Sequence, residues 1–270
     1  MPLLATDISV GDHIQRHFLG LTINIDTVWA TAAALLVVLG ITWAVRRQAR
    51  QSAGGGVPGR LQVAWEVGIQ AVTQQIEGSI GERGLVYVPL ALSLFLFILI
   101  CNFFEVFGLG GKYELLAVPT ADINLPLAMA LLVIVLVHTA SIRARGFRGY
   151  VHHYVFHPFP VILAPFNIFI NVVEEVAKPI TLALRLFGNL FSGGLMISLI
   201  AALGAWKLGD IPIGNVVTLI FAVVWKLFDV FLIGPIQAFI FTLLTILYFD
   251  TAMSTDDPEE LIHVEPVPTT

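Results

Sequence analysis

The chain has 270 residues, of which 57% are hydrophobic and 12% charged, and its formal net charge is −5. Soluble domains carry about 25% charged residues, so this chain has too few charges to cover the surface of a soluble fold. The composition predicts a membrane protein and argues against a disordered chain, a disulfide-rich secreted domain and a nucleic-acid-binding protein.

Three apolar segments have the length of simple spanning helices, which need about 20 residues. They are residues 27–45, 84–107 and 123–142, and the third contains His138 as its only titratable group. The preceding segment, 1–26, carries several charges before the first apolar stretch, unlike a cleaved signal peptide. We expect this segment to lie outside the membrane and the first span to remain in the mature protein.

An amphipathic helix is predicted between the first two spans, at residues 58–82. Its apolar residues recur at helical spacing and its other face carries glutamine and glutamate, which is typical of a helix lying flat on a membrane surface. The apolar residues are Leu61, Trp65, Ile69, Val72, Ile76 and Ile80.

The two longest apolar regions, 161–206 and 211–250, are broken only by a few charges. At 1.5 Å per residue they correspond to roughly 70 Å and 60 Å of helix, whereas a bilayer core is about 30 Å thick. Each region is therefore a hairpin of two short spans or one strongly tilted helix. Neither interruption contains turn residues, so we predict two long tilted helices within a single membrane domain, 27–255.

Basic residues near the ends of the five predicted spans set the orientation. Eight arginines share one side, and only Arg16, Lys112 and Lys207 share the other. The positive-inside rule then places the N-terminus outside and the acidic tail, 256–270, in the cytoplasm. The eight are Arg46, Arg47, Arg50, Arg60, Arg83, Arg143, Arg145 and Arg148.

The cysteine and histidine residues show no spacing that is typical of a metal or cofactor site. Cys101 is the single cysteine and lies in an apolar run, so neither an intrachain disulfide nor a thiolate cluster can form. The histidines lack metal-ligand spacing, and His152 and His153 are expected in a loop. We expect no metal and no cofactor.

Apart from Asp250 at the very end of the second region, six ionisable residues lie inside the two long regions, where such residues usually mark an ion or proton path. Glu174 and Lys178 form an i,i+4 pair in the favourable order, which a simple salt bridge would explain. Glu175 points about 100° away from this pair and needs a wet cavity or access to the surface. The other three are Arg185, Lys226 and Asp229.

Arg185 has no local explanation. No acidic residue lies within seven positions on its own helix, and arginine stays protonated in proteins. Its partner must be a carboxylate from elsewhere, either Asp229 or an acid of another subunit. Lys226 and Asp229 are close enough in sequence for a local pair, and Pro235 is expected to kink their helix.

Weaker polar signals lie in the middle spans. Asn102 and Glu105 end the second span, and Asp122 and Asn124 precede the third as a helix cap or as a polar funnel on the outer side. His138 is interpreted as a buried hydrogen-bonding residue rather than a proton relay.

Three sequence motifs resemble a known family. Lys178-Pro-Ile-Thr-Leu-Ala-Leu-Arg185-Leu-Phe-Gly-Asn189-Leu-Phe-Ser-Gly-Gly resembles the signature of subunit a of F-type ATP synthase, and residues 236–248 resemble its last helix. Pro119-Thr-Ala-Asp122-Ile-Asn124 is similar to the family segment before the middle span. The combination of Lys226-Leu-Phe-Asp229 with Ser192-Gly193-Gly194 looks most like the actinobacterial branch.

The resemblance implies an all-α stator subunit of the bacterial inner membrane, with no active site of its own. Such a subunit packs against a ring of c subunits, each with one membrane-embedded carboxylate, and b-type stalk subunits connect it to the F1 sector. Protons enter by a half-channel from outside, travel with the ring and leave by a second half-channel. Arg185 matches the family's essential arginine, which stabilises the ionised carboxylate and blocks direct leakage.

The resemblance also places other residues on the proton path. Asp122 and Asn124 would lie on the outer side, and Glu174 and Glu175 in the cytoplasmic half-channel. The other expected members are Asn189, Ser192, Gln237, Lys178 and His138. Gly194 and Val230 stand where many members carry titratable groups, so Asp229 is expected to replace that pair in the outer half-channel.

The alternative is a self-contained secondary transporter or channel. Such proteins often show inverted repeats and helices interrupted by glycine or proline around a central site. No internal repeat is visible in this chain. A third possibility, a purely structural membrane subunit, predicts that neutralising Arg185 leaves transport intact.

Overall fold

The computed structural model describes residues 15–18, 21–52, 56–107, 118–156, 164–202 and 213–253. Five helical segments in these ranges are long and apolar enough to cross a membrane, which confirms the predicted all-α membrane architecture. The described part of the chain adds one small antiparallel hairpin, formed by β1 (Gln15–Phe18) and β2 (Leu21–Asn24). The predicted tail, 256–270, lies outside the described residues.

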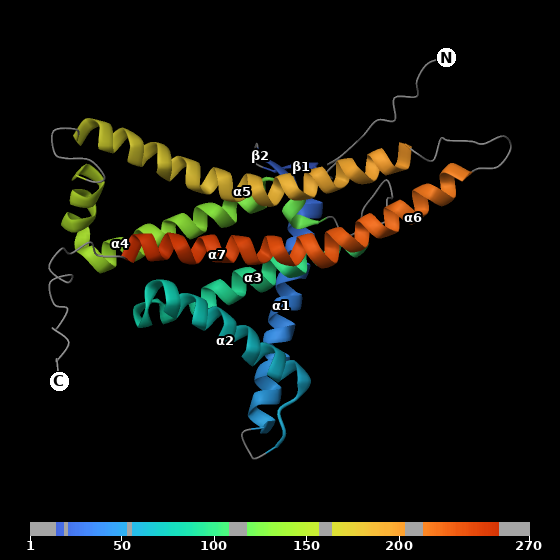
Figure 1. Cartoon of the computed structure of the whole chain (residues 1–270), viewed down its shortest axis with the longest axis horizontal. Coiled ribbons are helices and arrows are strands. Elements are labelled where there is room, and N and C mark those ends of the chain that lie inside the picture. The colour runs from blue at the N-terminus through green and yellow to red at the C-terminus, as the bar shows by residue number, and fades with distance from the viewer. Residues whose placement is uncertain are drawn as a thin grey trace, which may run out of the picture.

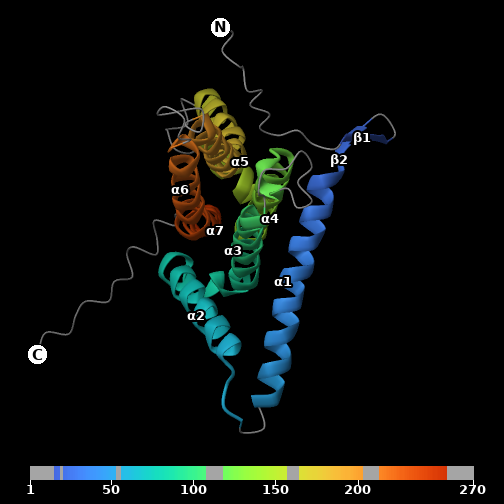
Figure 2. The same ribbon diagram turned by 90° about the vertical axis from the view of Figure 1, so that its right-hand side faces the viewer.

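The first span, α1 (Ile25–Ser52), runs along one side of the molecule, and α2 (Arg60–Ile80) diverges from its far end (Figure 2). Asp26 in the first turn of α1 and Arg50 in the last turn complement the helix dipole. The α2 helix ends at Gly81, whose positive φ of 75° favours glycine and whose N–H donates to the carbonyl of Glu77.

The second and third spans form the centre of the molecule. The second consists of η1 (Glu82–Tyr87), α3 (Val88–Phe103) and η2 (Phe104–Phe107). A short η3 (Pro119–Ala121) precedes the third span, α4 (Asn124–Phe156).

The predicted loop at His152 and His153 is wrong, because α4 continues through both residues. The helix changes direction at Gly146, where φ is 71° and ψ is 162°. Glycine adopts this conformation without steric cost, so the chain bends there and then resumes its helix.

The two longest helical segments show no loop at their charged interruptions. One is α5 (Ala164–Ala202), which contains Pro179, and the other joins α6 (Ile213–Phe228), the π-helical η6 (Asp229–Ile233) and α7 (Gly234–Met253) end to end. Both segments extend crosswise to α1 (Figure 1). This course matches the predicted pair of long, strongly tilted helices.

The core lies where α3, α4, α5 and α7 pack together. Ile98, Val133, Leu186 and Phe241, one from each helix, are completely buried. Because lipid tails are as apolar as these side chains, close van der Waals packing and interhelical hydrogen bonds hold the helices together. Packing of one side of α5 in this core leaves its other side chains facing outward.

Candidate functional site

Arg185 lies in the middle of α5 with an exposed side chain. The adjacent Leu186 is completely buried in the core, whereas Leu184 is exposed. Within the described ranges Arg185 forms no salt bridge, so the Asp229 partner left open by the sequence is not found. A permanent cation therefore faces outward from a largely apolar surface, where an acid of another subunit is the remaining candidate partner.

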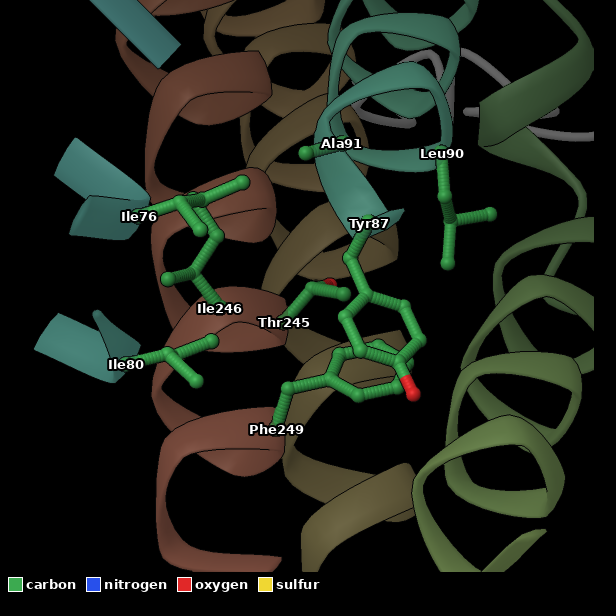
Figure 3. Close-up of a pocket in the computed structure, with 8 residues that line it drawn as sticks. All are labelled: Ile76, Ile80, Tyr87, Leu90, Ala91, Thr245, Ile246 and Phe249. Atoms are coloured by element: carbon green, nitrogen blue, oxygen red, sulfur yellow. The ribbon is translucent and has the colours of Figure 1, made fainter. Parts of the chain in front are cut away.

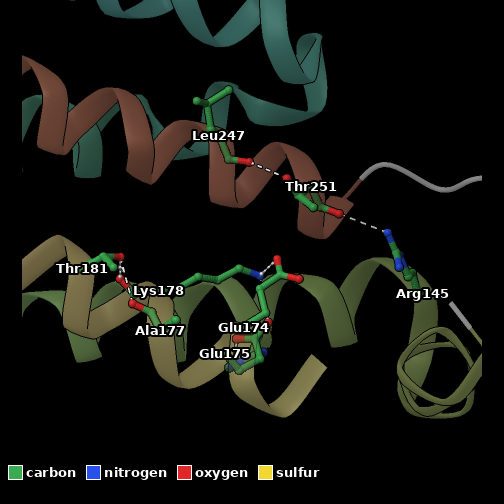
Figure 4. Close-up of polar contacts among 9 residues, drawn as sticks. Arg145, Glu174, Glu175, Ala177, Lys178, Thr181, Leu247 and Thr251 are labelled. Atoms are coloured by element: carbon green, nitrogen blue, oxygen red, sulfur yellow. Dashed lines mark hydrogen bonds and ion pairs between the residues drawn. The ribbon is translucent and has the colours of Figure 1, made fainter. Parts of the chain in front are cut away.

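A first group of polar residues surrounds Lys178, toward the start of α5 (Figure 4). The Lys178 Nζ atom lies 3.0 Å from Glu174 Oε1 and 3.0 Å from Glu175 Oε1. The predicted Glu174–Lys178 pair is thus present. Glu175, whose surroundings the sequence left open, turns toward α4, and its Oε2 atom lies 3.0 Å from His138 Nε2.

His138 extends this group along α4. Its Nδ1 atom lies 3.2 Å from the hydroxyl of Tyr150, beyond the bend at Gly146. Lys178 also approaches α7, with Nζ 5.9 Å from the ring centroid of Tyr248. We call His138, Tyr150, Glu174, Glu175 and Lys178 the α4–α5 network.

The cytoplasmic ends predicted for α4 and α7 lie together. The Arg145 guanidinium donates a hydrogen bond to the carbonyl of Thr251 at 3.2 Å (Figure 4). The basic end of α4 and the end of α7 are therefore on the same side of the molecule. The predicted orientation, which rests on the number of arginines on each side, puts both of these ends on one side of the membrane.

A second group of polar residues surrounds Asp229, at the start of η6. Asp229 is 2% exposed, and its Oδ2 atom has no hydrogen-bond partner among the described residues. It packs against Gly193 of α5, where an added Cβ would lie 2.6 Å from Oδ2. Glycine at this position therefore lets the carboxyl group approach the backbone of α5.

Glu105 and Asn102 join Asp229 from the end of the second span. Glu105 Oε1 lies 3.0 Å from Lys226 Nζ, so Lys226 pairs across helices rather than locally with Asp229. Glu105 also lies near Asp229, and the two acids repel each other when both are ionised. The Asn102 amide donates to the carbonyl of Gly234. Thr120 belongs to the same group because its hydroxyl donates a hydrogen bond to Asn102. We call Asn102, Glu105, Thr120, Lys226 and Asp229 the α3–η6 network.

Sequence reasoning noticed Asn102 and Glu105 only as polar residues that end a span. Their i,i+3 spacing places them on one helix face, which was an available signal. Gly234, whose carbonyl accepts from Asn102, and Lys226, which pairs with Glu105, lie more than 100 positions away in the sequence. Only the packing of α3 against the last helical segment brings them together.

Asp122 forms a separate junction between α1 and α4. Its Oδ2 atom accepts hydrogen bonds from the Asn24 amide at 2.7 Å and the Thr27 hydroxyl at 2.9 Å. Its Oδ1 atom accepts from the backbone N–H of Asn124 at 3.0 Å and from the Asn124 side chain at 2.8 Å. This geometry is that of a helix cap which also fixes the start of α1.

The remaining predicted residues lie near the middle of the two long segments. Ser192 donates a hydrogen bond to the carbonyl of Asn189 on α5. Gln237 is 7% exposed, and its Nε2 atom has no hydrogen-bond partner in the described residues. A buried amide of this kind usually bonds to another helix or to water.

The two networks contact α5 at different points along its length. Lys178 precedes Arg185 by about 10 Å of helix, and Gly193, which faces Asp229, follows Arg185 by about 12 Å. Arg185 therefore lies between the α4–α5 network and the α3–η6 network.

An apolar pocket lies apart from these groups, where α2, α3 and α7 meet (Figure 3). Tyr87 stacks on Phe249 there, with ring centroids 4.1 Å apart. The lining residues carry no formal charge, so the pocket belongs to the packing of α2 rather than to an ion path. They are Ile76, Ile80, Tyr87, Leu90, Ala91, Thr245, Ile246 and Phe249.

The fold and the site define a multi-pass helical membrane protein with ionisable residues set within its long helices, as in ion-translocating proteins. The sequence profile of the family described as ATP synthase A chain matches residues 27–250. The chain belongs to this family, whose members are the proton-translocating stator subunits of the F0 sector of ATP synthase.

Individual relatives cover nearly the whole chain. The ATP synthase subunit a of Acidothermus cellulolyticus is 43% identical over 254 residues, which cover 94% of this chain and 86% of the relative. That of Mycobacterium tuberculosis is 41% identical over 268 residues, covering 94% and 97%. The Vibrio cholerae subunit is 34% identical over 249 residues, covering 87% and 86%. The higher identity to the two actinobacterial proteins confirms the resemblance to that branch.

Proposed function

We propose that this chain couples proton flow to rotation of a ring of c subunits, and so to ATP synthesis, through two offset half-channels and Arg185. The position of Arg185 carries the proposal. It is an outward-facing cation without an ion-pair partner among the described residues, and it lies between two polar networks on one helix.

The outer half-channel is proposed to end at the α3–η6 network. A proton from the outer solution is accepted by the Asp229 carboxylate and passes to an ionised carboxylate on the ring. Asn189, Ser192 and Gln237 supply polar groups near this transfer, and Asp122 with Asn124 lies on the outer side of the path. When the proton has passed to the ring, Asp229 is ionised again, so each transfer restores its starting charge.

The inner half-channel is proposed to begin at the α4–α5 network. A ring carboxylate that reaches this side releases its proton toward Glu174 and Glu175. Lys178 balances the charge of these two acids. His138, which the residues alone favoured as a structural hydrogen-bonding group, accepts the proton from Glu175 on the way to the cytoplasm in this proposal. The 3.0 Å distance between Glu175 and His138 is within hydrogen-bond range, as such a transfer requires.

Arg185 keeps the two half-channels separate. An ionised carboxylate inside a membrane is costly, and a guanidinium offsets this cost with an opposite charge and paired hydrogen bonds. Because arginine does not deprotonate, it cannot pass a proton from one network to the other. One charge crossing 100 mV gains only about 2.3 kcal/mol, so a ring must sum several protons for each ATP.

The proposed setting is the bacterial inner membrane, with the N-terminus outside and the C-terminus in the cytoplasm. The proposed partners are the c-subunit ring, b-type peripheral stalk subunits, the F1 sector reached through that stalk, and membrane lipid. The arginines near the ends of α1 and α4 support this orientation.

Replacement of Arg185 tests the proposal. Arg185→Ala is expected to abolish proton-driven ATP synthesis in membrane vesicles while the complex still assembles, because the ring carboxylate loses its counter-charge. Arg148→Ala, which removes an exposed arginine near the end of α4, is the matched control and should retain synthesis. Normal synthesis by Arg185→Ala would refute the assignment.

Reconstitution tests the alternative of a self-contained transporter. The purified chain without a ring should not move protons across liposomes, whereas the assembled F0 sector should. Proton transport by the chain alone would favour a transporter.

A further inference from the structure

The segment that carries Asp229 is a π-helical turn. η6 joins α6 to α7, and at its end the N–H of Gly234 donates to the carbonyl of Asp229, five residues back. A π turn adds one residue to the helical winding and is frequent at functional sites. The added residue rotates the side chains before it by about 100° relative to those after it.

Asn102 reaches this turn from α3. Its Nδ2 atom donates a hydrogen bond to the carbonyl of Gly234 at 3.1 Å, and its Oδ1 atom accepts one from the Thr120 hydroxyl at 3.2 Å. Asn102 is 3% exposed and Thr120 is completely buried. An added Cβ on Gly234 would lie 3.3 Å from the Cβ of Asn102, so glycine there permits this close approach.

The hydrogen bonds form a single chain from η3 to Asp229. Thr120 donates to Asn102, Asn102 donates to the Gly234 carbonyl, and the Gly234 N–H donates to the Asp229 carbonyl. The residue after Gly234 is Pro235, which has no N–H, so the helix ladder lacks one bond to a carbonyl within the turn. The bond from Asn102 to the Gly234 carbonyl is a separate, interhelical bond that ties the end of the turn to α3.

The carboxyl of Asp229 lies directly against the backbone of Gly193. Its Oδ2 atom occupies the space next to Gly193 where a side chain would otherwise lie, 2.6 Å from an added Cβ. A return of the turn to regular α-helix would rotate Asp229 away from α5.

We propose that Asn102 is a positioning residue for proton transfer. It holds the π turn in place and thereby directs the Asp229 carboxyl at Gly193 of α5. The effect on transport rests on the proposed function of Asp229, whereas the positioning itself is a matter of geometry and can be measured separately.

Disulfide cross-linking measures the geometry. Gly193→Cys and Asp229→Cys are combined with Cys101→Ser, which removes the chain's single cysteine, in membranes that contain the assembled ATP synthase. An added Cβ at position 193 would lie 3.6 Å from Asp229 Cγ, the position that a cysteine sulfur would take, so mild oxidation should link positions 193 and 229. Adding Asn102→Leu should lower the yield at least several-fold, and Thr120→Val should lower it less. Ser93→Ala removes an exposed hydrogen bond within α3 and should leave the yield unchanged.

Proton transport measures the consequence. With Asp229 intact, Asn102→Leu should slow proton uptake and alter its dependence on outer pH, because the carboxyl is displaced relative to Glu105, Lys226 and Gly193. Ser93→Ala should change neither quantity. A slower rate with an unaltered pH dependence would point to a general structural role and would overturn the positioning proposal.

The two readouts separate the positioning of Asp229 from its function. If Asn102→Leu leaves the cross-link yield unchanged, or if no cross-link forms even with Asn102 present, the positioning proposal is overturned and the proposed function stands. If the yield falls while transport and its pH dependence stay normal, the positioning stands and Asp229 is removed from the proton path.

Discussion

At the scale of single residues, the contact between Asp229 and Gly193 joins the two long segments at the site. The small residues Ser192, Gly193 and Gly194 follow Arg185 and allow a neighbouring helix to approach closely, but the sequence alone does not show which side chain meets Gly193. The structure supplies that partner, a carboxyl group that is 2% exposed. Glycine at position 193 therefore belongs to the site together with Asp229, because it leaves the space that the Asp229 carboxyl occupies.

An alanine at position 193 tests this contact. Gly193→Ala places a Cβ 2.6 Å from Asp229 Oδ2, so the carboxyl must move. Overpacking of this kind costs about 1–3 kcal/mol. We expect proton-driven ATP synthesis to fall by about tenfold, the change that 1.36 kcal/mol produces in a rate. Gly40→Ala is the control, since nothing lies within 4 Å of its added Cβ, and equal activity of the two variants would contradict the account.

Neutralising Asp229 tests its proposed role directly. Asp229→Asn keeps the shape of the side chain but cannot carry a proton, so proton uptake should slow by about 100-fold or more, as for other positioned proton-transfer groups. Asp229→Glu retains the acid and should keep much of the activity. Unchanged pumping by Asp229→Asn, measured by acidification of inverted vesicles, would make Asp229 a structural residue.

At the scale of elements, the Asp122 junction explains how α1 is held. The first span has few buried residues, namely Thr27, Ala30, Ala34 and Val45. Four hydrogen bonds to the Asp122 carboxylate attach the start of α1 to the start of α4. The sequence suggested a cap or an outer polar funnel. The two donors of Asn124 fit a cap of α4, whereas Asn24 and Thr27 donate from the start of the first span.

Removal of this carboxylate tests the junction. Hydrogen bonds to charged groups contribute about 1.5–3 kcal/mol each, so Asp122→Ala should lower the temperature at which the purified complex loses subunit a. Thr27→Val, which removes a single donor, should have a smaller effect in the same direction. A variant with normal thermal stability but no proton transport would show that Asp122 acts on the path rather than as an anchor.

The elements also show where sequence periodicity succeeds and fails. The lengths of the apolar regions predicted five spans and two long segments, because membrane helices are strongly constrained in composition. The π turn at Asp229–Ile233 could not be read from that pattern, because the residues after it are apolar on most sides and a rotation of about 100° therefore displaces no clear apolar face. The extension of α4 through His152 was missed because its end is polar, although only the bend at Gly146 interrupts the helix.

At the scale of the whole molecule, the two polar networks lie on either side of Arg185 along α5. The sequence predicted Arg185, Glu174, Lys178 and Asp229 as important, because charges in apolar regions are costly. It missed the contributions of Glu105 and Asn102, because their partners depend on how α3 packs against η6 and α7. Residue type thus predicted which charged residues are costly inside the membrane, whereas the packing of the helices determined which of them are in contact.

The most direct test of the central claim is the distance from Arg185 to the ring in a structure of the assembled ATP synthase. The account predicts that the guanidinium lies within about 4–6 Å of a c-subunit carboxylate, where opposite charges interact strongly. It also predicts that the α3–η6 and α4–α5 networks lie toward opposite membrane surfaces. An Arg185 that faces lipid, or that pairs with an acid of its own chain while the ring carboxylates pass elsewhere, would contradict the account.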